Sequence, residues 1–104
     1  MATPYIAGTA ALVMKARGLV GKASTVAQLL YNTANPVTKS TESGVTTRPE
    51  AVFRQGSGLV NVANALGATV TASPSTIKLG EGTNHTVFIS LTNRTGGTLK
   101  YKVA

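Results

Sequence analysis

The sequence contains no cysteine, no aspartate and no tryptophan, and it contains only one histidine. Without cysteine the chain has no disulfide framework and no thiolate metal site, and one histidine does not make a metal cluster or a two-histidine proton relay. Without aspartate the chain has no Ser-His-Asp triad of its own. We therefore expect no catalytic, cofactor-binding or metal-binding residue in this chain, and no cofactor.

Negative charge is also scarce. Ten lysines and arginines stand against three glutamates, which gives a formal net charge of +7. The cations are spread singly and are not interleaved with stacking aromatic side chains, so we expect no specific nucleic-acid binding and interpret them as a solvated surface. A basic module that binds anions is a weaker alternative.

Residues 1–14 form an uncharged, mostly apolar stretch. This stretch is too short to span a bilayer. Its neighbouring cations, Lys15 and Arg17, follow the stretch, whereas a signal peptide carries them in front of its apolar region. We therefore predict no targeting segment and no membrane span in this chain.

The chain has 104 residues, and a chain of this size buries only about 60–65% of the surface that its unfolded form exposes. The composition is 42% hydrophobic but only 12% charged and 5% aromatic. Such a composition is typical of the interior of a larger structure rather than of a small domain with a solvated surface. We therefore expect that a partner surface is missing.

Helical periodicity dominates the first two thirds of the chain. A helix is predicted over three ranges, residues 4–17, 25–32 and 59–66. Ser24 or Thr25 is the expected cap of the second helix, and Gly67 is expected to end the third in a left-handed conformation. The first helix is rich in Ala and Gly, which suits a central helix enclosed by its neighbours. Residues 37–55 lack sustained periodicity and are predicted to form a long surface loop.

After Gly67 the apolar pattern changes to the alternation of β-strands. Strands are predicted at residues 77–79, 87–91 and 99–103. The change marks a domain boundary near residues 67–72, with one domain over 1–67 and a second over 68–104. A β-sandwich needs about seven strands, so we expect the second domain to be incomplete. The predicted fold class is α/β, mainly helical here, followed by a partial antiparallel β-sandwich.

Two segments resemble the subtilisin-like serine proteases. Residues 1–14 read Met-Ala-Thr-Pro-Tyr-Ile-Ala-Gly-Thr-Ala-Ala-Leu-Val-Met. They are similar to the nucleophile segment of the family, Gly-Thr-Ser-Met-Ala-Thr-Pro-His-Val-Ala-Gly, with Tyr5 and Ile6 replacing the commoner His and Val. Residues 55–66 begin Gln-Gly-Ser-Gly-Leu-Val and resemble the closing stretch of the same catalytic domain, usually Gly-x-Gly followed by a short helix. Residues 68–104 resemble the fibronectin-III-like domain that follows in larger secreted members, in a form typical of fungal enzymes.

The resemblance implies a fragment of a secreted serine endopeptidase. The nucleophilic serine of the family directly precedes the position of Met1, and its aspartate, histidine and oxyanion-hole asparagine lie further upstream. The resemblance therefore implies a chain that is inactive alone, whose partners are the remainder of the protease domain and, in the parent, protein substrates. The alternative is a truncated, non-enzymatic secreted protein that acts as a binding or effector protein.

Two candidate glycosylation sites, Asn84 and Asn93, lie in the β part. Each begins an Asn-x-Thr tripeptide, which is the acceptor sequence on secreted eukaryotic proteins. Because the chain has no aspartate, His85 cannot be part of a Ser-His-Asp triad, and we interpret it as an exposed histidine at a strand end. The serines without a nearby base in sequence are interpreted as cap, loop and turn residues, namely Ser24, Ser57 and Ser73.

Overall fold

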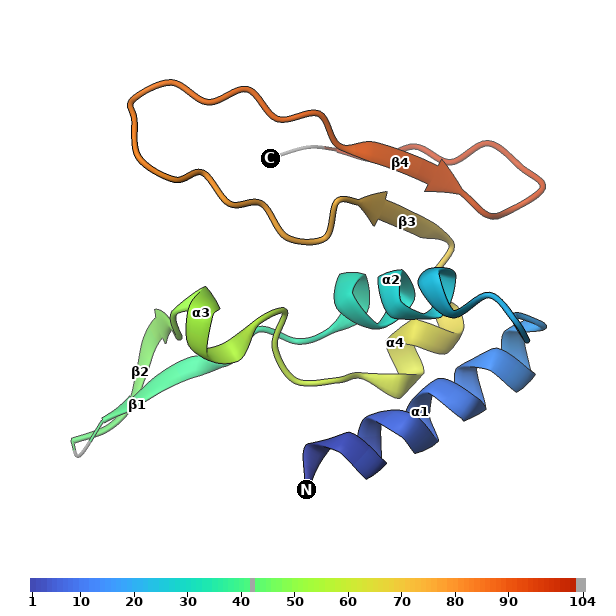
Figure 1. The fold of residues 1–104 in the computed structure, drawn as a ribbon, viewed down its shortest axis with the longest axis horizontal. Helices are drawn as coiled ribbons and strands as arrows, with labels where there is room; N and C mark the ends of the chain where they lie inside the picture. Colours follow the sequence, from blue (N-terminus) through green and yellow to red (C-terminus); the bar gives the residue numbers. More distant parts are fainter. Residues whose placement is uncertain (42, 103–104) are drawn as a thin grey trace.

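The computed structural model describes residues 1–41 and 43–102. In this part of the chain the fold is mixed α/β, with helices and two small antiparallel sheets. The elements are, in order, α1 (Ala2–Arg17), α2 (Ala23–Thr33), β1 (Thr38–Thr41), β2 (Gly44–Pro49), α3 (Val52–Gln55), α4 (Val62–Gly67), β3 (Val70–Ser73) and β4 (Ser90–Asn93). Figure 1 shows α1 on one side of α2 and α4, and the β3–β4 pair on the other side of α2.

The first two helices lie where the apolar spacing predicts them. α1 begins earlier than expected and ends at Gly18, whose φ of 63° is left-handed. α2 begins directly after Lys22, because the N–H of Val26 already bonds the carbonyl of Lys22 at 3.2 Å. The prediction that Ser24 or Thr25 caps this helix is therefore wrong, since both residues lie inside its first turn.

α4 is shorter than the helix predicted over residues 59–66. Asn61 is its N-cap, because the Asn61 side-chain oxygen accepts a hydrogen bond from the N–H of Asn64 at 2.9 Å. Leu59, expected to be helical, is extended and forms an isolated β-bridge. Gly67 is the last helical residue and has no left-handed conformation, so that prediction is wrong. The chain leaves α4 in an extended conformation that leads directly into β3.

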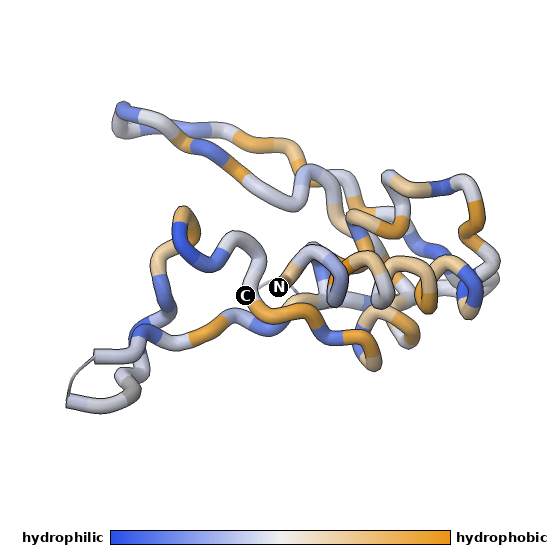
Figure 2. The backbone as a smooth tube through the Cα atoms, turned by 60° about the horizontal axis from the view of Figure 1, so that its bottom comes forward, coloured by the Kyte–Doolittle hydropathy of each residue, from blue (hydrophilic) through white to orange (hydrophobic). Residues whose placement is uncertain are grey.

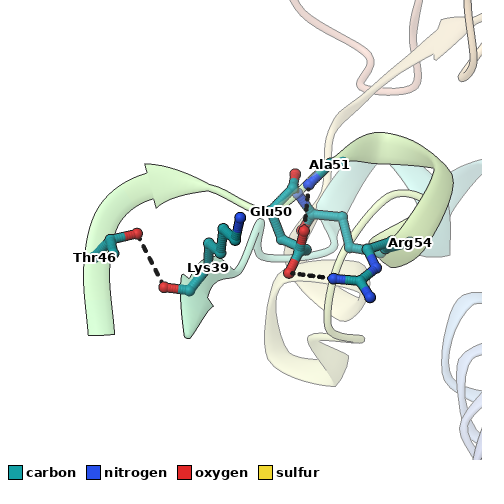
Figure 3. A network of polar contacts seen from close by, with 6 residues as sticks. Lys39, Thr46, Glu50, Ala51 and Arg54 are labelled. Carbon is teal, nitrogen blue, oxygen red and sulfur yellow. Dashed lines mark hydrogen bonds and ion pairs between the residues drawn. The ribbon is translucent and has the colours of Figure 1, made fainter. Parts of the chain in front are cut away.

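The prediction of a long loop over residues 37–55 is wrong, because this range contains the β1–β2 hairpin and α3. The hairpin is rich in threonine, whose branched Cβ suits paired strands. Thr46 donates a hydrogen bond across the hairpin to the carbonyl of Lys39 at 3.0 Å (Figure 3). All four residues of β1 are exposed, so the strand has no buried face and its sequence shows no hydrophobic alternation.

Glu50 and Gln55 hold the base of the hairpin. The Glu50 carboxylate accepts the N–H of Ala51 at 2.9 Å and lies 3.9 Å from the guanidinium of Arg54 (Figure 3). The Gln55 side chain donates to the carbonyl of Glu50 at 2.6 Å and accepts the N–H of Val37 at 2.8 Å. The ion pair is long and its Arg54 side is exposed, whereas both bonds of Gln55 are short, so the Gln55 side chain is the stronger link between the hairpin and α3.

The β part is smaller than predicted. β3 was not expected, and β4 only overlaps the end of the predicted 87–91 strand. Residues 77–79 and 99–102 form no strand, and Val103 lies outside the described residues. Alternation produces a stable strand only where a partner supplies hydrogen bonds, and this segment offers few partners. What is present is a two-stranded antiparallel sheet.

The hydrophobic core lies between α1, α2 and α4. Its buried side chains are Val13, Val26, Leu29, Leu30 and Ala65. Large apolar side chains remain exposed elsewhere, and Figure 2 shows hydrophobic stretches in the long excursion between β3 and β4 as well as in the helices. The chain exposes 8122 Å², whereas a compact monomer of 10.6 kDa is expected to expose about 5,500 Å². The fold therefore leaves open surface that a further segment or molecule can cover.

Candidate functional site

The start of α1 and the segment before α4 enclose one groove. This groove has a volume of about 480 Å³ and is lined by Met1, Ala2, Tyr5, Ile6, Gly58, Leu59 and Val60. The first four residues belong to the segment 1–14 and the last three to the segment 55–66. The structure thus brings together the two sequence segments that resemble the subtilisin-like proteases, although they lie far apart along the chain.

Gly58 positions one wall of the groove. Its φ of 111° lies in the region that favours glycine, and a Cβ at this position would overlap the carbonyl of Asn35. This close approach allows two hydrogen bonds at 2.8 Å, from Asn35 N–H to the Leu59 carbonyl and from Leu59 N–H to the Asn35 carbonyl. The bridge ties the end of α2 to the groove.

α1 begins at the groove, with Met1 as its N-cap and Ala2 as its first residue. Met1 is the N-cap and provides no side-chain acceptor, and no acidic residue lies in the first turn. The first N–H groups of a helix lack intrahelical partners, and the positive end of the helix dipole favours negative charge there. In the described part of the chain, the groove walls contain no carboxylate, imidazole or thiol, so the groove holds no serine–histidine pair, and the Tyr5 hydroxyl is its one ionisable side chain.

α1 is anchored on one face and open on the other. Val13 is fully buried in the core, and the hydroxyl of Thr9, also buried, donates to the carbonyl of Tyr5 at 2.9 Å. On a neighbouring face Gly8 and Leu12 are exposed, and nothing lies within 4 Å of a Cβ placed on Gly8. The sequence suggests an enclosed helix, but within this chain only one side of α1 is covered.

Arg17 fixes α1 to α4, and sequence reasoning missed it. Its guanidinium donates to the carbonyls of Leu66 at 2.9 Å and Ala68 at 2.7 Å, with a longer contact of 3.5 Å to Ala65. These carbonyls lie at the C-terminal end of α4, where helix carbonyls lack intrahelical partners and the dipole favours a cation. The sequence shows a cation at a helix end, but nothing in it indicates a partner so far along the chain.

The structure does not bring His85 to the groove. His85 is exposed in the segment between β3 and β4, which lies on the opposite side of α2 from α1 (Figure 1). The three serines are equally dispersed, Ser24 in α2, Ser57 in the turn after α3 and Ser73 in β3. Within residues 1–41 and 43–102, no three His, Cys, Asp or Glu side chains cluster as a metal site.

The two candidate glycosylation sites differ in their surroundings. Asn84 is exposed, outside any helix or strand. Asn93 is also exposed, but its side-chain nitrogen donates to the carbonyl of Gly97 at 2.7 Å. Its side-chain oxygen accepts from the N–H and the hydroxyl of Thr95, at 2.9 and 2.7 Å. At Asn93, the side-chain nitrogen that would carry a glycan is therefore already hydrogen-bonded.

Comparison of the chain with protein-family models, with curated proteins and with solved structures gives no match. Among the described residues, no helix is long and apolar enough to cross a membrane.

Proposed function

We propose that residues 1–67 are the part of a secreted subtilisin-like serine endopeptidase that follows its nucleophilic serine, and that residues 68–104 begin a fibronectin-III-like domain. The observation that carries this proposal is the groove at the start of α1, where the two segments that resemble the family meet. The chain alone has no peptidase activity in this proposal, because the serine, histidine and aspartate of the family's triad have no counterpart in its sequence.

The geometry of α1 supports the proposed role of the chain in the parent enzyme. A serine placed directly before Met1 would stand at the N-terminal end of the helix, where the N–H groups and the dipole stabilise negative charge. The resemblance implies that this serine attacks the scissile carbonyl and that a histidine of the parent takes its proton. The buried face of α1 and the hydrogen bonds from Arg17 to the end of α4 would fix the position of this helix, and so the position of the serine at its start.

The first expected result concerns the chemistry of the chain itself. The 104-residue chain is expected to cleave no peptide substrate and to form no covalent adduct with a fluorophosphonate probe, because in residues 1–41 and 43–102 no serine hydroxyl is hydrogen-bonded to a histidine, glutamate or lysine side chain. Intact-mass spectrometry measures the adduct, with an active subtilisin-type enzyme labelled in parallel as the control. A stoichiometric adduct on Ser24 or Ser57 would contradict the proposal.

The origin of the segment is tested on the coding DNA. Codons for Gly-Thr-Ser in frame directly before Met1, with histidine and aspartate motifs further upstream, are the outcome expected for a protease segment. An in-frame stop codon directly upstream would instead support the alternative, a small secreted binding or effector protein without enzymatic activity.

Secretion from a eukaryotic host is expected to add a glycan mainly at Asn84. The Asn84 side chain is exposed in an irregular segment, whereas a glycan on Asn93 would replace the hydrogen bond to Gly97. Mass spectrometry after glycosidase treatment measures occupancy at each asparagine. The matched variants Thr86→Ala and Thr95→Ala each remove one acceptor sequence. Occupancy that is lost in Thr95→Ala but kept in Thr86→Ala would contradict this expectation.

A further inference from the structure

The β3–β4 sheet has one closed edge and one open edge. On the outer edge of β3, the Asn32 side chain accepts the N–H of Ala72 at 2.8 Å and donates to the Ala72 carbonyl at 3.2 Å. The side-chain amide of Asn32 therefore occupies the position that a neighbouring strand would take. In residues 1–41 and 43–102 no further strand pairs with this sheet, and Figure 1 shows no element beyond β4.

The register of the sheet shows which groups the open edge presents. The N–H of Arg94 bonds the carbonyl of Thr69 at 2.8 Å, and Leu91 lies opposite Ala72. Hydrogen-bonded and non-bonded pairs alternate in an antiparallel ladder, so Leu91 and Ala72 form a non-bonded pair whose backbone groups point away from each other. The contact of Ala72 with Asn32 agrees with this register. Leu91 therefore directs its N–H and carbonyl outward from β4.

The chain around this edge has the composition of an aggregation-prone strand. Residues 87–92 read Val-Phe-Ile-Ser-Leu-Thr, with no charge, no proline and no glycine. Val87, Phe88, Ile89 and Leu91 are all exposed, Phe88 at 87%. Natural edge strands are usually protected by a charged residue, a proline or a bulge, and this segment has no lysine or proline and its paired residues show no bulge.

We propose that the open edge of β4 binds a second copy of this chain, as a two-fold antiparallel pair of β4 strands in which Leu91 faces Leu91 of the other copy. The pairing would turn two two-stranded sheets into one continuous four-stranded sheet, a size that is much more stable than an isolated hairpin. Identical strands satisfy each other across a two-fold axis, which is the commonest symmetry of oligomers. This proposal does not depend on the proposed origin of residues 1–67.

The exposed area of the chain is sufficient for such a dimer. Each copy exposes roughly 2,600 Å² more than a compact monomer of its mass, and a standard interface covers only about 800 Å² per partner. Val70, Ala72, Leu91 and Tyr101 line a hollow of about 590 Å³ on the sheet, so an apolar face accompanies the open edge. Each copy carries a net charge of +7, which opposes association, so added salt is expected to strengthen the dimer.

The test compares the unglycosylated chain with three variants by sedimentation equilibrium over a wide range of concentration. Leu91→Pro removes the outward N–H and leaves the ladder bonds of β3–β4 in place, whereas Leu91→Ala keeps the N–H and shortens the side chain. Leu79→Pro is the matched control, at an exposed leucine outside any strand. We expect Leu91→Pro to weaken dimerisation by about 30-fold, because two N–H···O bonds are lost per dimer. Leu91→Ala and Leu79→Pro are expected to weaken it much less.

The Thr92 N–H belongs to the ladder, so its hydrogen exchange reports whether the β3–β4 sheet persists in Leu91→Pro. We expect this amide to stay protected. A persisting ladder with a lost dimer supports the proposal. A chain that is monomeric at every concentration, open-ended growth instead of a closed dimer, a dimer unaffected by Leu91→Pro, or a dimer weakened by salt would each overturn it.

Discussion

Replacing Gly58 by alanine is expected to destabilise the chain by about 3–5 kcal/mol. The backbone at Gly58 has a φ of 111°, which alanine adopts only with strain, and the new Cβ would overlap the carbonyl of Asn35. The conflict is with backbone atoms, so no side chain can rotate away to relieve it. The bridge between Asn35 and Leu59 must then open, and the groove loses one wall.

Urea unfolding measures the loss of stability, and hydrogen exchange of the Leu59 amide reports the bridge itself. Gly8→Ala is the matched control, because nothing lies within 4 Å of a Cβ at Gly8 in the exposed helix interior. This control is expected to stabilise the chain by about 0.5–1 kcal/mol. Retained stability and retained protection at Leu59 in Gly58→Ala would show that the close approach to Asn35 is not made.

Replacing Arg17 by methionine is expected to cost about 2–3 kcal/mol, because the carbonyls of Leu66 and Ala68 lose a charged donor. Methionine keeps an unbranched apolar side chain, so the change removes mainly the hydrogen bonds. The amides of α4 and β3 are expected to exchange faster, because Arg17 connects α1 to the junction between them. Urea unfolding together with hydrogen exchange measures both effects.

Lys15→Met is the control for Arg17→Met. Lys15 lies in the same last turn of α1 and is exposed, so its replacement is expected to change stability by less than about 0.5 kcal/mol. Equal effects of the two substitutions would mean that Arg17 acts only through the charge at the end of α1 and not through its bonds to α4.

The groove shows which parts of the candidate site can be predicted from the sequence. The residues of both walls stand in segments that the sequence singles out, 1–14 and 55–66, because their motifs are local. Their meeting depends on Asn35, which no motif marks, and on the conformation of Gly58. A bridge between residues so far apart in the chain has no periodic signal, so only the folded chain reveals it.

The sequence by itself determined which chemistry is absent and where α1 and α2 lie. The missing aspartate excludes a Ser-His-Asp triad within the chain without any structure, and helical periodicity reports contacts within a few residues. Only the tertiary structure reveals the β1–β2 hairpin, the hydrogen bonds from Arg17 to the end of α4, and the Asn32 contact that occupies the outer edge of β3. Each of these depends on hydrogen bonds between distant segments or, for β1, on a strand with no buried face, and neither feature produces a periodic pattern in the sequence.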